Sequence, residues 1–165
     1  MAQVRDAALQ IARKEMRAGA REIGGNNRGP WVRKYLAGAG LEEGLPWCAS
    51  FVSWCYREAA DKLGIPPPFA YQPSVRRLYT ACVKKGWRVE IPQPGDLVFW
   101  TRGPVNRGLG HMGFVEYAHH NLIQTIEGNH TSKVERFKYE WEGMPRFLGF
   151  IRVQEQKQTT KTRRA

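Results

Sequence analysis

The apolar pattern of this 165-residue chain changes its period near Pro92, and that change constrains the fold more than any other feature. Before Pro92, apolar residues recur at helical spacing in four segments. After it, short runs rich in β-branched and aromatic residues follow one another closely. Helical and strand segments alternate in a doubly wound sheet, so their segregation here indicates an α+β fold. We therefore expect N-terminal helices packed on a C-terminal antiparallel sheet of about five strands.

Start and stop signals give the bounds of the expected elements. Helices are expected over residues 2–19, 31–37, 48–63 and 74–85. Strands are expected over residues 95–100, 111–117, 122–128, 134–141 and 147–153. Their close succession favours a meander, in which each strand pairs with the next. The pattern predicts a single domain over residues 1–153 and a basic, flexible tail over 154–165.

Composition and charge narrow the class of protein. With 42% apolar and 12% aromatic residues, the chain has enough apolar side chains for one well-formed core. Its 26 Lys and Arg residues exceed its 15 Asp and Glu residues, which gives a net charge of +11. Such an excess either solubilises the surface or attracts an anionic partner, such as nucleic acid or an anionic cell-wall polymer.

The pattern contains neither a signal peptide nor a membrane span. The N-terminus lacks a basic region followed by an apolar one, and no run approaches the roughly 18 apolar residues needed to cross a bilayer. We therefore expect neither export by the usual signal route nor insertion into a membrane.

Cys48 follows Pro46-Trp47 and begins the amphipathic pattern of residues 48–63, so a thiol is expected on the first turn of a helix. Unpaired N–H groups and the positive end of the helix dipole favour the thiolate there, and the thiolate is the nucleophilic form. Cys55 lies seven residues further on, or roughly 10 Å at about 1.5 Å per residue, beyond the disulfide reach of about 7 Å. Cys55 and Cys82 are therefore predicted to be buried free thiols.

A histidine and a carboxylate later in the chain would complete a thiol-based catalytic set. His111 opens an expected strand, where its side chain has a fixed direction. Glu127 and Asn129 are two residues apart, so both are expected on one face of the following strand. If the two strands form a hairpin around residues 118–121, Glu127 comes nearly opposite His111 and accepts its Nδ1 proton. Each residue alone has an ordinary structural explanation, and only their order along the chain points to catalysis.

Three further histidines and several tryptophans are also candidates for a site. His119, His120 and His130 have no cysteine or carboxylate at zinc-ligand spacing around them, so no metal site is expected there. Among the tryptophans, Trp54 is expected in the core. Three others are candidates to line a substrate groove: Trp47, Trp100 and Trp141.

Three segments together resemble the CHAP family of cysteine, histidine-dependent amidohydrolases and peptidases, in the papain-like NlpC/P60 superfamily. They are GLPWCASFV (residues 44–52), PGDLVFW (94–100) leading to GHMGFV (110–115), and TIEGN (125–129). The resemblance extends over roughly residues 20–153 and is to small, single-domain phage and bacterial members. It implies a papain-like fold with the nucleophilic cysteine at a helix N-terminus.

The resemblance also implies roles for the site residues. Cys48 would be the nucleophile, His111 the general base and then acid, Glu127 the orienting residue and Asn129 an auxiliary polar group. The implied reaction is hydrolysis of a peptidoglycan amide by an N-acetylmuramoyl-L-alanine amidase or by an endopeptidase of the peptide stem or bridge. The backbone N–H of Cys48 is a candidate oxyanion donor.

The substrate is expected to contact residues around this set. Candidate substrate-binding residues are Trp47, Trp100, Gly110, Gly113 and Gln72, the two glycines because they leave room beside His111 for a substrate backbone. A second oxyanion donor is sought among Asn26, Asn27 and Gln72.

No cofactor is expected. Some family members bind calcium through acidic residues near the N-terminus, whereas this chain has only Asp6, Glu15 and Glu22 there and no Asp-x-Asp-x-Asp loop. Neither calcium nor another metal is therefore predicted.

The expected partner is bacterial peptidoglycan, bound by a monomer without a membrane span. A phage endolysin is the first expectation, made in the cytoplasm and acting at the cell wall after holin-type release, virion delivery or specialised secretion. An amidase effector delivered by a secretion system is one alternative. A non-catalytic, basic nucleic-acid-binding protein is the other, although no nucleic-acid recognition motif accompanies the charge.

Overall fold

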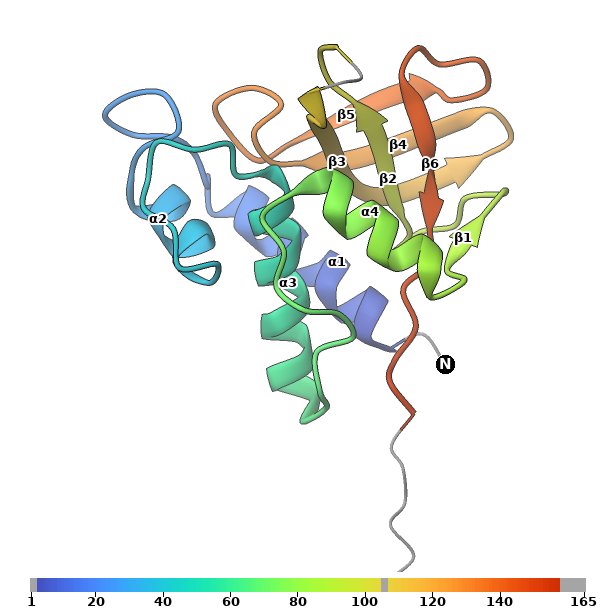
Figure 1. The fold of residues 1–165 in the computed structure, drawn as a ribbon, viewed down its shortest axis with the longest axis horizontal. Helices are drawn as coiled ribbons and strands as arrows, with labels where there is room; N and C mark the ends of the chain where they lie inside the picture. Colours follow the sequence, from blue (N-terminus) through green and yellow to red (C-terminus); the bar gives the residue numbers. More distant parts are fainter. Residues whose placement is uncertain (1–2, 105–106, 158–165) are drawn as a thin grey trace, which may run out of the picture.

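Four helices precede six strands in the computed structural model, which describes residues 3–104 and 107–157 (Figure 1). The helices are α1 (Gln3–Arg17), α2 (Pro30–Ala37), α3 (Cys48–Leu63) and α4 (Val75–Lys84). The strands are β1 (Arg88–Val89), β2 (Leu97–Thr101), β3 (Gly110–His119), β4 (Leu122–Glu127), β5 (Glu135–Glu140) and β6 (Phe147–Ile151). The predicted α+β class is confirmed, and the four helices lie in the expected segments.

The six strands form one antiparallel sheet in the order β1-β6-β2-β3-β4-β5. Strands β2 to β5 form the predicted meander, but β6 pairs with β2 instead of β5, so a simple five-strand meander is wrong. Burial of apolar side chains favours this pairing, because Phe150 and Ile151 of β6 are buried beside Val98 and Leu97 of β2. β1 has only two residues, too short for an alternating pattern to reveal it.

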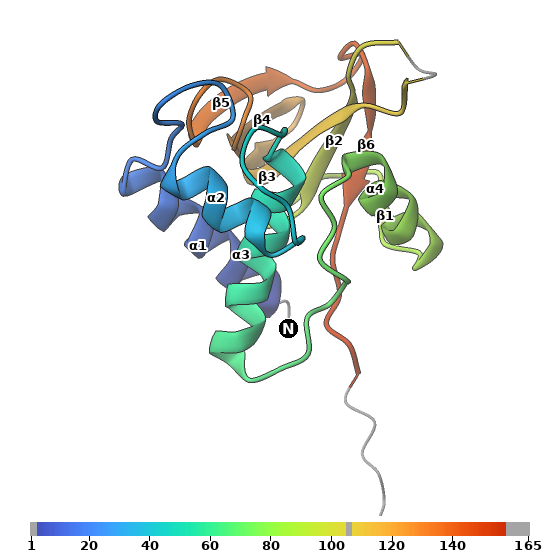
Figure 2. The ribbon, with the colours of Figure 1, turned by 60° about the vertical axis from the view of Figure 1, so that its left-hand side comes forward.

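Helices α1 and α3 lie on one side of the sheet, as Figures 1 and 2 both show, and α2 packs on α3. α4 packs against β2, β3 and β6. Met112 and Phe114 of β3 enter the main core with Phe51 of α3. Val115 instead joins a second apolar cluster with Val98, Trp100, Ile123 and Phe150. Because strand side chains alternate between faces, His111 lies on the face of β3 that carries Val115.

Cys55 and Cys82 are free and buried, as predicted. Burial raises the pKa of Cys82 to about 12 and also raises that of Cys55. Both thiols are therefore protonated at neutral pH.

A buried carboxylate joins the first helix to the sheet. Asp96, just before β2, is fully buried and accepts hydrogen bonds from Arg5 of α1 (3.1 Å) and from Nη2 of Arg152 (2.8 Å) beyond β6. A buried charge is tolerated only when it is paired in this way. The PGD segment before β2 therefore has a structural function.

The C-terminal segment contacts the body of the domain further than expected. Glu155 accepts a hydrogen bond from the backbone N–H of Val4 (2.9 Å), and Gln156 donates one to the carbonyl of Pro67 (2.9 Å). Residues 158–165 lie outside the described ones, and a flexible tail over residues 154–165 stays a prediction. Within residues 3–104 and 107–157, no helix has the length and apolar character needed to cross a bilayer.

Candidate active site

Cys48 is the first residue of α3, as predicted from the sequence. Trp47 occupies the N-cap, and its carbonyl accepts the first helical hydrogen bond from Phe51 (2.8 Å). An indole only donates hydrogen bonds, so the Trp47 side chain leaves the N–H groups of the first turn free. Cys48 is 4% exposed and therefore lies in a largely dry environment beside these donors.

Asn129 holds the start of this helix. Its Oδ1 accepts a hydrogen bond from the backbone N–H of Trp47 (3.0 Å), and its Nδ2 donates to Oδ1 of Asn27 (3.0 Å). The expectation that Asn129 shares a strand face with Glu127 is wrong, because β4 ends at Glu127 and Asn129 has a φ of 64°. The contacts make Asn129 a positioning residue for the residue before Cys48.

His111 lies near the beginning of β3, opposite Trp100 of β2. The two rings stack, with centroids 5.7 Å apart and an angle of 23° between their planes. His111 is 5% exposed, so its orientation is fixed by packing as well as by the strand.

Glu127 reaches His111 over Gly113, which has no side chain in the way. The pair Phe114–Ile126 sets the register of β3 and β4, and a Cβ added to Gly113 would lie only 2.5 Å from Cγ of Glu127. Glu127 therefore leans over Gly113 and reaches His111 diagonally, with Oε1 3.4 Å from Nε2. The predicted opposite pairing was wrong because the hairpin turns at residues 120–121, where His119 pairs with Leu122, and the bulge between Val115 and Tyr117 recovers only one residue of the difference.

The ring nitrogen also differs from the prediction. Glu127 faces Nε2 of His111 and not Nδ1. The 3.4 Å separation makes this contact an ion pair more than a hydrogen bond. With Nε2 facing the carboxylate, Nδ1 is the other ring nitrogen, and among the described residues it is buried without a hydrogen bond of good geometry.

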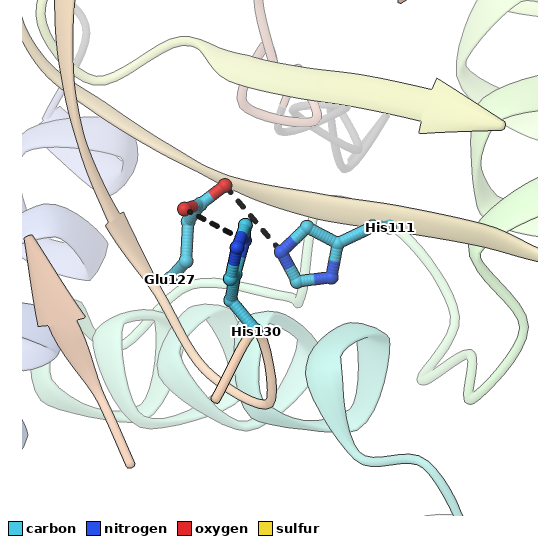
Figure 3. Close-up of side chains that lie close together, drawn as sticks. All are labelled: His111, Glu127 and His130. Carbon is cyan, nitrogen blue, oxygen red and sulfur yellow. Dashed lines mark ion pairs between the residues drawn. The ribbon is translucent and has the colours of Figure 1, made fainter. Parts of the chain in front are cut away.

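The Glu127 carboxylate has two further partners that the sequence did not predict. Its Oε2 accepts a hydrogen bond from the Tyr139 hydroxyl of β5 (2.9 Å) and lies 3.6 Å from Nδ1 of His130. Figure 3 shows Glu127 directed toward both His111 and His130. The expectation that no carboxylate lies at zinc-ligand spacing around His130 overlooked Glu127, three residues earlier. The spacing of three between Glu127 and His130 was the signal available, but a turn at Gly128 and Asn129 obscured it.

Opposing effects set the protonation of the two histidines. Burial alone would lower the pKa of His111, but its contacts with the Cys48 thiol and the Glu127 carboxylate outweigh burial and raise the pKa to about 9. The imidazolium therefore prevails at neutral pH. Burial lowers the pKa of His130, so that its ring is neutral at the same pH.

Two cavities flank the histidines. One, of about 350 Å³, is lined by Trp100, His111, Tyr139 and Arg146 among others. The other, of about 390 Å³, is lined by polar groups that include Asn26, Asn27 and Asn129. The first cavity is therefore mainly apolar and the second mainly polar, and Arg102 and His130 lie at both.

The predicted substrate-contacting residues are only partly found at these cavities. Trp100 lines the apolar cavity, whereas Trp47 is fully buried, stacks on Tyr35 and donates its indole N–H to Glu22 (3.1 Å), so a groove position for Trp47 is wrong. Trp141 lines a different cavity, beside Ile91.

The two glycines beside His111 have a packing function. A Cβ on Gly110 would lie 2.7 Å from Cγ1 of Val75, and Gly113 makes room for Glu127, while a substrate contact at either glycine stays a prediction. Gln72 lies in the turn before α4, where its Oε1 accepts from the N–H of Ser74 (3.1 Å). Its substrate and oxyanion roles stay predictions, as do those of Asn26 and Asn27.

The raised pKa of His111 yields a direct prediction. In an NMR titration of labelled histidine, we expect His111 to titrate near pH 9 and Cys48→Ala or Glu127→Gln to move its pKa toward the ordinary value of about 6.5. The same pairing stabilises the fold fully below about pH 6.5, and this contribution is lost as pH rises through about 9. Cys82→Ala is the matched control and should leave the titration unchanged. A His111 pKa near 6.5 in the unmutated protein would contradict this account of the site.

Comparison with known proteins identifies the family. A model of the CHAP domain matches residues 40–129, more than half of the chain, and this range contains Cys48, His111 and Glu127. Searches of curated proteins and of solved structures gave no match. The CHAP domain implies hydrolysis of peptidoglycan by an amidase or peptidase that depends on a cysteine and a histidine. The chain belongs to the CHAP family.

Proposed function

We propose that the chain hydrolyses an amide bond of peptidoglycan with Cys48 as nucleophile, His111 as proton carrier and Glu127 as the group that orients and charges His111. One observation carries the proposal: the helix N-terminus that bears Cys48 meets a histidine that is buried, ion-paired with a buried carboxylate and raised in pKa by both partners. All three residues lie within the range that matches the family.

Acylation begins from the ion pair of thiolate and imidazolium. The Cys48 sulfur attacks the amide carbonyl carbon, forming the C–S bond while the carbonyl π electrons move onto oxygen. The N–H of Cys48, on the free first turn of α3, is placed to donate to this oxyanion. Collapse of the intermediate breaks the C–N bond, and His111 gives its proton to the departing amine.

Deacylation uses the same imidazole in the opposite sense. Neutral His111 accepts a proton from water as the water oxygen attacks the thioester carbonyl carbon. Breaking the C–S bond releases the carboxylic acid product and restores the thiolate beside the imidazolium. The buried charge of Glu127 stabilises the imidazolium at both ends of the cycle, and Tyr139 holds that carboxylate in place.

The cavities are suited to a peptide that carries carboxylates. Apolar walls at Trp100 and Met144 accept small side chains, and the exposed guanidinium groups of Arg102 and Arg146 attract anionic groups. Both the muramoyl-alanine junction and the peptide stem or bridge present amides close to small side chains and carboxylates. The substrate bond is therefore proposed to be one of these, cleaved by either amidase or endopeptidase action.

An endolysin is the biological context that we propose first, because the motifs resemble those of small, single-domain phage and bacterial enzymes. An injected amidase effector would use the same site and the same chemistry. The net charge of +11 suits either enzyme on an anionic wall. A nucleic-acid-binding function has no support other than this charge.

Product analysis tests the proposed reaction. Purified peptidoglycans of several cross-link types, incubated with the reduced protein, should release soluble fragments with new amine and carboxyl ends that mass spectrometry identifies. Cys48→Ala should lower the rate by about three orders of magnitude or more without loss of the fold. Cys82→Ala, at another buried thiol, should retain activity. Equal release by the Cys48→Ala variant, or no release from any wall type by the folded protein, would contradict the proposal.

The arginine at both cavities yields a second prediction. Arg102→Glu should lower kcat/KM on peptidoglycan by about tenfold at low salt, and the difference should shrink in concentrated salt because screening weakens the attraction. Lys62→Glu makes a matched charge change near the far end of α3, about 20 Å from Cys48 at 1.5 Å per residue, and should remain within about twofold of the unmutated protein. Equal losses in the two variants would mean that Arg102 acts only through the net charge.

A further inference from the structure

We propose that His111, Glu127 and His130 form a binding site for one divalent transition-metal ion, for which Zn²⁺ is the natural probe. Occupation of the site would suppress the thiol reaction. The suppression rests on the proposed function, whereas binding of the metal does not.

The donor set is one that zinc accepts. Two imidazoles and one carboxylate hold zinc in sites that keep a further position open. In this chain, one possible ligand atom of each residue lies within 4.8 Å of the others. Figure 3 shows the two imidazoles on the same side of the Glu127 carboxylate.

The separations suit a tetrahedral ion. Ligand atoms at about 2.0–2.1 Å from a tetrahedral centre are about 3.4 Å apart. Nε2 of His111 lies 3.4 Å from Oε1 of Glu127, and Nδ1 of His130 lies 3.6 Å from Oε2. Each ring faces a different carboxylate oxygen, so an ion that contacts all three residues needs the carboxylate to bind through both oxygens or the two rings, whose ligand atoms lie within 4.8 Å of each other, to turn toward one of them.

Two of these ligand atoms lack a strong partner. Among the residues that the structure describes, Nε2 of His111 and Oε1 of Glu127 are buried without a hydrogen bond of good geometry, although they face each other. Buried polar atoms are rarely left in this condition. A metal ion between them would satisfy both.

The surroundings supply support and access. Tyr139 donates to Glu127 (2.9 Å) and fixes the carboxylate, in the way that outer hydrogen bonds orient metal ligands. The His130 ring packs on Phe137 with centroids 4.2 Å apart. Because 39% of the His130 side chain is exposed and the cavity of about 350 Å³ opens beside it, an ion can reach the site from solvent.

The bound ion would block the proposed reaction at a defined atom. Nε2 of His111 would hold the metal in place of its proton, and the ring would then carry a single proton, on Nδ1. It could neither accept the thiol proton to become an imidazolium nor, without becoming an imidazolate, deliver a proton to the departing amine. Relief by a chelator follows, because no covalent bond to the chain is formed.

Isothermal titration calorimetry with ZnCl₂ on the reduced full chain tests the binding. We expect the unmutated protein and Cys48→Ser to bind one equivalent and His130→Ala to bind about tenfold more weakly or worse. A double variant, His119→Ala with His120→Ala, removes two adjacent histidines elsewhere and should bind like the unmutated protein. X-ray absorption of the zinc complex should give only nitrogen and oxygen neighbours, at about 2.0–2.1 Å.

Three results would overturn the site. They are no binding by the unmutated protein, unchanged affinity in the folded His130→Ala variant, and a sulfur neighbour at about 2.3 Å that disappears with Cys48→Ser. The last would assign the metal to the thiolate.

The inhibitory consequence has its own readout. Zinc should slow peptidoglycan release, EDTA should restore it, and half-inhibition should need about tenfold more zinc in His130→Ala, measured against that variant's own metal-free rate. Unchanged activity of the zinc-loaded protein would overturn the suppression. Absence of activity in the metal-free protein would instead contradict the proposed function, while the calorimetry would still decide the metal site.

Discussion

The buried carboxylate of Glu127 is the group on which the arrangement of this site depends. It is fully buried, accepts a hydrogen bond from Tyr139 and faces the rings of His111 and His130. A buried carboxylate is stable only when its charge is compensated. The ion pair with His111 compensates the charge of Glu127, and the same ion pair helps to raise the pKa of His111. The charge is brought close enough by Gly113, whose missing side chain makes room for Glu127 to lean toward the histidine.

The segment Glu127-Gly128-Asn129 links this charge to the nucleophile, and each residue fixes one contact. Glu127 faces His111, while a Cβ on Gly128 would lie 2.7 Å from the Trp47 ring, so glycine lets the two segments approach. Asn129 accepts a hydrogen bond from the Trp47 N–H and thereby holds the residue that precedes Cys48. Three consecutive residues thus align the helix that carries the thiol with the strand that carries the base. The same geometry places His130 on Glu127, and the catalytic and metal-binding proposals share that carboxylate.

The sequence predicted the parts of the molecule that local patterns encode. The four helices, the position of Cys48 at a helix start and the burial of Cys55 and Cys82 all follow from periodicity and end signals. The relations between strands did not, because neither the turn at residues 120–121 nor the one-residue change of register at the Val115–Tyr117 bulge leaves a sign in the apolar pattern. Tyr139 and His130 were missed because they come to Glu127 from another strand and from a turn. Trp47 was misplaced because its indole donates a hydrogen bond to the half-buried Glu22, which lies 25 residues earlier.

The central claim is that Glu127 acts on the Cys48 thiol through His111. A double-mutant cycle on the rate at which iodoacetamide alkylates Cys48 at pH 7 tests it most directly, because thiol reactivity is measurable even when turnover is lost. Cys55 and Cys82, both buried, serve as internal controls. The account predicts that Glu127→Gln slows alkylation in the unmutated background and has no further effect once His111→Ala is present. Effects of the two substitutions that multiply would contradict it.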